Sequence, residues 1–307
     1  MSHEKVIVVG VDGSEASLAA VDWAVAEASR TGHRLHVVCA YALPSFTAAS
    51  LDGGYAAMDD TAIQQGAQAV VDEAVARTAD SGLRVTSSLE TGDPAGVLVD
   101  LSREAALVVV GTRGGGGFTD RLLGTVSSAL PAHAHCPTVV VPLSPARSFL
   151  PVRRIVVGVD GSESARIALR RAVDEAIVWD AELSAVAAVP IATGAGAMAW
   201  LPAAVDRDEV LADVREGLGV AVKAAVGDRD VRVRQHALDG NAAALMAEFS
   251  TAVELVVVGS RGRGGFAGLL LGSTSQAVLH HAVCPVMVVP SRSADEGAAP
   301  TDVPWNQ

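Results

Sequence analysis

Short apolar runs alternate along the chain with longer segments in which small apolar residues recur at helical spacing. The runs KVIVVGV (5–11), RLHVVCAY (34–41) and ALVVVG (106–111) are rich in β-branched residues and predict buried strands. Between the first two, SEASLAAVDWAVAEASRTG (14–32) predicts a helix that stops at its final glycine. The other expected elements are a helix over about 60–81, a strand over 83–90, a short helix over 94–104, a helix near 125–134 and a strand over 137–142.

This alternation favours parallel sheets, because consecutive parallel strands need a crossover segment and such crossovers are right-handed. We therefore expect an α/β protein of two tandem, doubly wound, Rossmann-like domains, each with a five-stranded parallel sheet covered by helices on both faces. In such sheets ligands bind beyond the carboxyl ends of the strands, where the strand order reverses.

The second half of the chain repeats the first at a constant offset. IVVGVDGSE occurs at residues 7–15 and again at 155–163, and Gly259 follows Gly111 by the same 148 positions. A register this constant indicates two copies of one domain. We expect one domain over residues 1–142, a linker over 143–152, a second domain over 153–290, and a disordered tail rich in Pro, Gly and Ala over 291–307.

Composition narrows the classes of function. The 307 residues are half hydrophobic and carry a formal net charge of −12, which disfavours nucleic acid as a partner but allows a small anion in a local pocket. No apolar run is long enough to span a bilayer, no targeting signal is visible, and the three cysteines form no secretory pattern. We expect a reduced, cytoplasmic protein without a membrane span.

Two glycine-rich loops, GTRGGGGFTDRLLGTVS (111–127) and GSRGRGGFAGLLLGSTS (259–275), each lead from a strand end to a hydroxyl residue at a helix start. Glycine lets the backbone approach a ligand closely, and a helix N-terminus favours phosphate oxygens. A flexible hinge with an ordinary N-cap is the alternative for a single loop. A P-loop is excluded because the only lysines, Lys5 and Lys223, lie outside the loops, and a dinucleotide fingerprint is excluded because these glycines follow the fourth strand.

These features resemble the universal stress protein family. The resemblance covers residues 5–142 and 153–290 and includes the VDGS turns and the endings HAHCPTVVVP and HAVCPVMVVP. It implies the fold of the universal stress proteins and adenine nucleotide alpha hydrolases, in the tandem type and in the branch that binds ATP. The family motif Gly-x2-Gly-x9-Gly-[Ser/Thr] stands at Gly111, Gly114, Gly124 and Thr125, and again at Gly259, Gly262, Gly272 and Ser273.

The resemblance implies one ATP site in each copy. Residues after the first strand would flank the adenosine, small and branched residues of the second and fourth strands would line the base and ribose, and the loop and helix start would bind phosphates through N–H groups and hydroxyls. The first site comprises Gly10, Val11, Asp12, Ala40, Val110, Gly111, Gly114, Gly124, Thr125, Val126 and Ser127. The second comprises Gly158, Val159, Asp160, Ala188, Val258, Gly259, Gly262, Arg263, Gly272, Ser273, Thr274 and Ser275.

Several roles stay open at this point. Asp12 and Asp160 would accept hydrogen bonds from ribose or adenine, reach Mg²⁺ through water, or only satisfy an Asx turn. Each His-x-x-Cys pair (133–136 and 281–284) is half of a zinc pattern, but the cysteines are better explained as small core residues. The second loop gains Arg263 and lacks the carboxylate that Asp120 adds to the first, which predicts tighter ATP binding in the second copy.

The expected function is that of an ATP-binding sensor or regulator in stress response or growth control. The alternatives are a slow ATPase or phosphotransferase, for which no general base or lysine clamp is evident, and a scaffold of the same fold without useful nucleotide affinity. The short edge strands and the resemblance imply that the two copies join as a pseudo-dimer within the chain. A homodimer and a regulatory protein partner are also expected.

Overall fold

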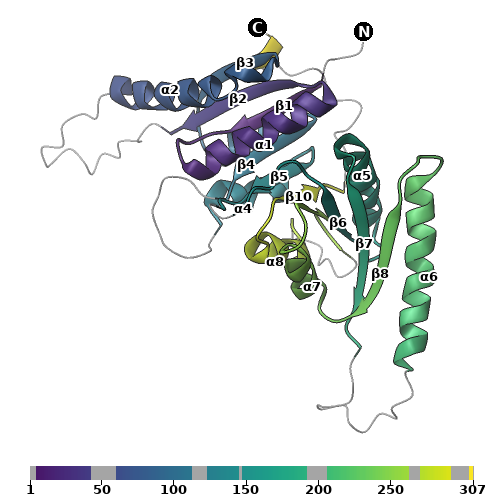
Figure 1. The fold of residues 1–307 in the computed structure, drawn as a ribbon. Helices are drawn as coiled ribbons and strands as arrows, with labels where there is room; N and C mark the ends of the chain where they lie inside the picture. The colour runs from purple at the N-terminus through teal and green to yellow at the C-terminus, as the bar shows by residue number, and fades with distance from the viewer. Residues whose placement is uncertain are drawn as a thin grey trace, which may run out of the picture. The chain divides into compact units, whose positions relative to one another are not determined.

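The computed structural model describes residues 5–42, 60–112, 123–144, 147–191, 206–262, 270–291 and 304–306. The chain divides into two units (Figure 1). Unit 1 consists of residues 1–143 with 293–307, and unit 2 of residues 144–292. The expected linker therefore falls almost wholly within unit 2. No helix among the described residues is both long and apolar enough to cross a membrane.

Unit 1 contains a parallel five-stranded sheet in the order β3-β2-β1-β4-β5. Its elements are β1 (Val6–Gly10), α1 (Glu15–Thr31), β2 (Arg34–Tyr41), α2 (Asp60–Ala76), η2 (Ala79–Ser81), β3 (Val85–Thr91), α3 (Pro94–Leu101), β4 (Leu107–Gly111), α4 (Thr125–His133) and β5 (Thr138–Val141).

Unit 2 repeats this arrangement in the order β8-β7-β6-β9-β10, again parallel. Its elements are β6 (Arg154–Gly158), α5 (Glu163–Trp179), β7 (Glu182–Val189), α6 (Arg207–Val226), β8 (Val233–Asp239), α7 (Ala242–Phe249), β9 (Leu255–Gly259), α8 (Ser273–His281) and β10 (Val286–Val289). The predicted α/β fold with two parallel-sheet domains is confirmed.

Local sequence explains where the long first helices begin and end. Ser14 and Ser162 are the N-caps of α1 and α5, and their hydroxyls accept from the backbone N–H groups of Ser17 and Ala165. Gly32 ends α1 in the left-handed conformation with φ 70°, where a side chain would be strained. The predicted helix over 14–32 is thus confirmed to within a residue at each end.

The strand order of each sheet determines where a ligand crevice is expected. Because parallel crossovers are right-handed, α1 and α2 cover one face of the unit 1 sheet, and α3 and α4 cover the other. The corresponding pairs in unit 2 are α5 with α6 and α7 with α8. The order reverses between β1 and β4 and between β6 and β9, so a ligand crevice is expected at the carboxyl ends of these strands.

The end of the chain corrects one expectation. Residues 304–306, which were expected in a disordered tail, form the short 3-10 helix η3 (Pro304–Asn306) against β3. Trp305 is only 5% exposed, and its ring lies 5.0 Å from the ring of His36 in an edge-on arrangement. Its carbonyl accepts from Arg34 Nη1 at 3.3 Å. A buried aromatic side chain near the chain end outweighs the polar composition around it.

Candidate functional site

A cavity of about 320 Å³ lies in unit 2 at the carboxyl ends of β6, β7 and β9. This is the position at which the strand order of the sheet reverses. Its walls also include the start of α8, the start of α5 and one side of α7. The lining residues are Gly158, Val159, Asp160, Ala165, Val186, Ala188, Ala242, Met246, Val258, Gly259, Arg261, Gly262, Leu271, Gly272, Ser273, Thr274 and Ser275.

Every described residue predicted for the second site lines this cavity, although the sequence separates them by more than a hundred positions. The fold brings together three strand ends and one helix start. Arg263 lies outside the described residues. The set that the structure gathers is Gly158, Val159, Asp160, Ala188, Val258, Gly259, Gly262, Gly272, Ser273, Thr274 and Ser275.

The start of α8 presents backbone N–H groups to the cavity. Its N-cap is Gly272, which has no side chain that could accept from these groups. The N–H of Gly272 itself donates to the Ser260 carbonyl at 2.7 Å. The amides of the first helical turn have no carbonyl partner within the helix, and the helix dipole adds positive potential there. Anionic oxygens are the natural partners of such a turn.

The serine hydroxyls at the third helix position have a structural task. Ser275 Oγ donates to the Gly259 carbonyl at 2.6 Å, and Ser127 Oγ donates to the Thr112 carbonyl at 2.7 Å. A hydroxyl carries one proton, and a phosphate only accepts, so these two hydroxyls cannot also donate to phosphate in this conformation. Contacts of these two hydroxyls with phosphate would need the bonds to the carbonyls to be broken, and phosphate binding by the backbone N–H groups of the helix starts stays a prediction.

Asp160 closes one side of the cavity. Its Oδ1 accepts from the Ser162 N–H at 2.9 Å, which is the Asx turn weighed above, and Asp12 accepts in the same way from Ser14 at 3.0 Å. The other oxygen of Asp160 faces the glycine loop, since a Cβ at Gly262 would lie 2.5 Å from Oδ2. A side chain at position 262 would therefore force the Asp160 carboxylate to move, and glycine lets the loop pass it without that shift.

The inner wall of the cavity is apolar. Val186 and Ala188 point to the same side of β7 because side chains alternate along a strand, and Ala242 and Met246 lie one turn apart on α7. Ala165, Val186, Ala242, Met246 and Leu271 were not predicted as lining residues, because apolar residues in a wall read as ordinary core. Val186 could have been predicted, because it lies two positions before Ala188 on the same strand and therefore on the same side of the sheet.

Arg261 brings positive charge to the rim. Its backbone N–H donates to Ser164 Oγ at 3.3 Å, and its Nη2 donates to Ser291 Oγ at 2.9 Å. An arginine within a glycine-rich loop can neutralise phosphate or lie in solvent. The structure places it in the cavity lining.

Unit 1 holds the equivalent residues at equivalent places. Gly10, Val11 and Asp12 follow β1 or end it, Ala40 lies near the end of β2, Val110 and Gly111 end β4, and α4 starts with Thr125, Val126 and Ser127 after its N-cap Gly124. Gly114 lies outside the described residues, as do Gly115 and Asp120.

One wall differs between the two units. Leu98 in unit 1 takes the position of Met246, and a Cβ at Gly10 would lie 2.9 Å from Leu98 Cδ1. The matching distance at Gly158 is 3.7 Å, to Met246 Cε and Sδ. Leu98 therefore lies closer to the end of its first strand than Met246 does.

The cysteines lie in the core, as their sequence context favours. Cys136 and Cys284 are buried, and their thiols donate to the carbonyls of Pro137 and Pro285. Burial, the largest effect, raises the pKa of the Cys284 thiol to about 12, which keeps it protonated and unreactive. Within the described part of the chain, no group of three or more His, Cys, Asp or Glu residues is placed to hold a metal ion.

Comparison with known proteins gives a consistent result over nearly the whole chain. The model of the Universal stress protein family matches residues 4–142 and 151–290. Universal stress protein Rv1996 of Mycobacterium tuberculosis (strain ATCC 25618 / H37Rv) is 34% identical over 304 residues, covering 92% of this chain and 94% of that protein.

A solved structure gives the same fold over nearly the whole chain. The crystal structure of a universal stress protein from Archaeoglobus fulgidus DSM 4304 matches with a TM-score of 0.69 at 21% identity, covering 94% of this chain and 99% of that one. A universal stress protein crystallised in complex with cAMP covers 47% of this chain and 100% of its own, at 28% identity and a TM-score of 0.36.

Proposed function

Because the chain belongs to the universal stress protein family and carries two of its domains in tandem, we propose that it is an ATP-binding sensor or regulator. One observation carries the proposal. The unit 2 cavity combines an apolar inner wall with the amides of a helix start, which have no carbonyl partner within the helix, and it lies where the strand order of the sheet reverses.

The two halves of the cavity suit the two halves of a nucleotide. Val186, Ala188, Val258 and Met246 offer an apolar wall against which a purine base can pack. The start of α8 and the loop at Gly262 offer backbone N–H groups for the phosphates, which lie at the other end of the ligand. No lysine is needed, because the dipole of α8 and Arg261 supply the positive potential.

Unit 1 is proposed to bind the same ligand through its equivalent residues. The second site is proposed to bind more tightly, because Met246 leaves more space than Leu98 and because the second loop has Arg263 where the first has Gly115. Mg²⁺ would reach the protein mainly through the phosphates, since Asp160 is the only carboxylate among the described residues that line the cavity. The proposal includes a homodimer and a regulatory protein partner that reads the bound state.

Matched cavity-filling variants test the proposal. Ala188→Leu fills the unit 2 cavity from β7, and Ala40→Leu makes the same change in unit 1. In isothermal titration with ATP, ADP and cAMP, we expect Ala188→Leu to remove the tighter ATP site and Ala40→Leu to remove the weaker one. Circular dichroism checks that both variants stay folded. Unchanged ATP binding in the double variant would contradict the proposal.

A further inference from the structure

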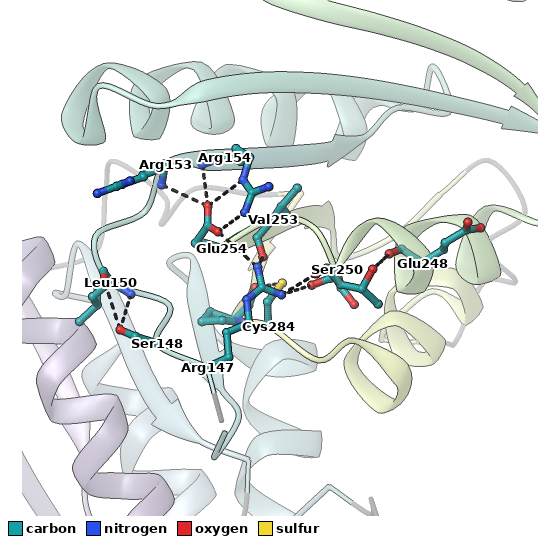
Figure 2. Close-up of polar contacts among 12 residues, drawn as sticks. Arg147, Ser148, Leu150, Arg153, Arg154, Glu248, Ser250, Val253, Glu254 and Cys284 are labelled. Carbon is teal, nitrogen blue, oxygen red and sulfur yellow. Dashed lines mark hydrogen bonds and ion pairs between the residues drawn. The ribbon is translucent and has the colours of Figure 1, made fainter. Parts of the chain in front are cut away.

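The segment that joins the two units is bound into unit 2 through one carboxylate. Figure 2 shows Glu254, just before β9, surrounded by donors from residues 147–154. Its Oε2 accepts from the backbone N–H groups of Arg153 at 3.3 Å and Arg154 at 2.9 Å. Its Oε1 accepts from Arg154 Nη2 at 2.7 Å and Arg147 Nη2 at 3.2 Å.

Arg147 makes the more distant connection. Its Nη1 donates to the carbonyls of Ser250 at 3.3 Å and Thr251 at 2.7 Å, and its Nη2 donates to that of Val253 at 2.7 Å. These carbonyls follow the C-terminal end of α7, where backbone oxygens lack partners within the helix. The planar guanidinium presents five N–H donors in a fixed fork, so it can hold these carbonyls and the Glu254 carboxylate at the same time.

The electrostatics favour a charged, closed cluster. The Glu254 side chain is 10% exposed, and burial alone would raise its pKa. Hydrogen bonds and charge from Arg154, together with Arg147, outweigh burial and hold the pKa of Glu254 below its usual range. Removing one partner of such a buried pair leaves an uncompensated charge. We call Arg147, Arg154 and Glu254 the linker latch.

The linker latch contacts the elements that form the candidate ATP cavity. Glu254 ties the starts of β6 and β9, whose carboxyl ends line the cavity, and Arg147 ties the end of α7, whose Ala242 and Met246 line it. Both connections pass along regular secondary structure. A shift of α7 at the cavity would therefore also move the carbonyls after its C-terminal end, to which Arg147 donates.

Unit 1 has no such cluster at the corresponding positions. The residues that correspond to Glu254 and Arg154 are Ala106 and Val6, which have no polar side chain. The fold therefore does not require the linker latch. It occurs in the unit that the linker enters, which indicates a role specific to the linker.

We propose that the linker latch couples the ligand state of the unit 2 cavity to the segment joining the two units. This inference rests on the proposed ATP binding and adds a route by which binding is transmitted. ATP favours the position of α7 in which the linker latch is closed, and a closed linker latch favours ATP. The coupling is reciprocal by thermodynamic necessity. Arg147 is thus a positioning residue for the site, not a ligand contact.

The test uses the full chain in the Ala40→Leu background, in which only the unit 2 site titrates. We expect Arg147→Ala to weaken ATP binding about fivefold or more, the usual lower range of such coupling. Arg153→Ala is the matched control, because Arg153 joins the cluster through its backbone N–H and its side chain points away (Figure 2). Arg147→Lys keeps the charge and should recover part of the affinity.

Hydrogen exchange at the linker segment measures the same coupling as an effect of bound ATP. ATP should slow exchange at the amides of Arg153 and Arg154, both of which donate to Glu254, and this effect should be absent in Arg147→Ala and in Ala188→Leu. The proposal would be overturned if Arg147→Ala bound ATP with full affinity, or if Arg147→Lys bound it no better than Arg147→Ala. It would also be overturned if ATP left the exchange rates of these two amides unchanged.

The two proposals can fail separately. If the Ala40→Leu chain binds no ATP, the proposed function fails. If it binds ATP but Arg147→Ala and Arg153→Ala bind it equally well, only the coupling fails. Exchange in ligand-free Arg147→Ala, compared with Arg153→Ala, also measures directly whether the linker latch holds the segment.

Discussion

At the scale of single residues, His36 is a buried histidine held neutral in unit 1. It is fully buried, and its ring nitrogens lie 2.9 Å from Thr86 Oγ1 and 3.1 Å from Ser88 Oγ. Burial, with a smaller contribution from the charge of Arg34, lowers its pKa from the ordinary value of 6.5 to about 4. The packed ring of Trp305 is one source of that burial.

This shift predicts that unit 1 loses stability in mild acid. Because the unfolded chain protonates His36 near pH 6.5 and the folded chain only near the lowered pKa of about 4, the stabilisation is complete above pH 6.5 and falls as the pH drops toward 4. Between pH 7 and 5 we expect a loss of about 2 kcal/mol from this group. Urea unfolding against pH measures it.

His36→Ser is the natural control, because unit 2 has Ser184 at the corresponding position. The variant should lack this part of the pH dependence, whatever its stability at pH 7. Identical pH slopes for the two proteins would show that His36 does not titrate as its surroundings require.

Residues that line the cavity through their backbone or small side chains were predictable, and residues whose partners are distant in the sequence were not. The glycines and hydroxyl residues of the second site follow from a repeated motif, and the structure gathers them around one cavity. Met246 reads as core in the sequence. Arg147 and Glu254 are far apart in sequence, and nothing in an aperiodic linker indicates which carbonyls a guanidinium will reach.

At the scale of elements, helix α5 packs so closely on β9 that only glycine fits at the strand end. A Cβ at Gly259 would lie 2.9 Å from the carbonyl carbon of Ser164 and closer still to its hydroxyl oxygen. Gly111 meets Ala16 of α1 in the same way, at 2.6 Å from its carbonyl carbon. The motif glycine at each strand end is therefore explained by packing as well as by ligand approach.

We predict that Gly259→Ala destabilises unit 2 by about 1–3 kcal/mol, the usual cost of overpacking against backbone. Gly272→Ala is the control, since its added methyl would lie at least 3.4 Å from its neighbours and its φ of −71° suits any residue. Urea unfolding of both variants checks this. Equal stabilities would contradict the packing explanation.

Element positions were largely predictable because hydrophobic periodicity and caps decide them. The strand predicted over 106–111 is β4, and the helix near 125–134 is α4. The helix over about 60–81 ends earlier, at Ala76, and continues as the short 3-10 helix η2 before Gly82. Helix ends without a strong cap are the least determined by local sequence.

At the scale of the whole molecule, the two units have the same fold but are contacted by different segments that lie outside the repeated domains. Unit 1 receives Trp305 from the chain end against β2 and β3, and unit 2 is joined to the linker through Glu254. The sequence repeat revealed two equal domains but neither attachment, because each joins a residue outside the repeat, Trp305 or Arg147, to positions at which the two copies differ. These differences support the proposal that the two sites are unequal.

The central claim is that each unit binds one adenine nucleotide through backbone amides at a helix start. Native mass spectrometry of the wild-type chain with ATP tests it most directly, because it counts bound ligands. We predict two ATP molecules per chain at saturation, and a singly bound species at low ATP that disappears in Ala188→Leu. A wild-type chain that stays free of ATP at millimolar concentration would contradict the account. So would an Ala40→Leu, Ala188→Leu double variant that still binds two ATP molecules.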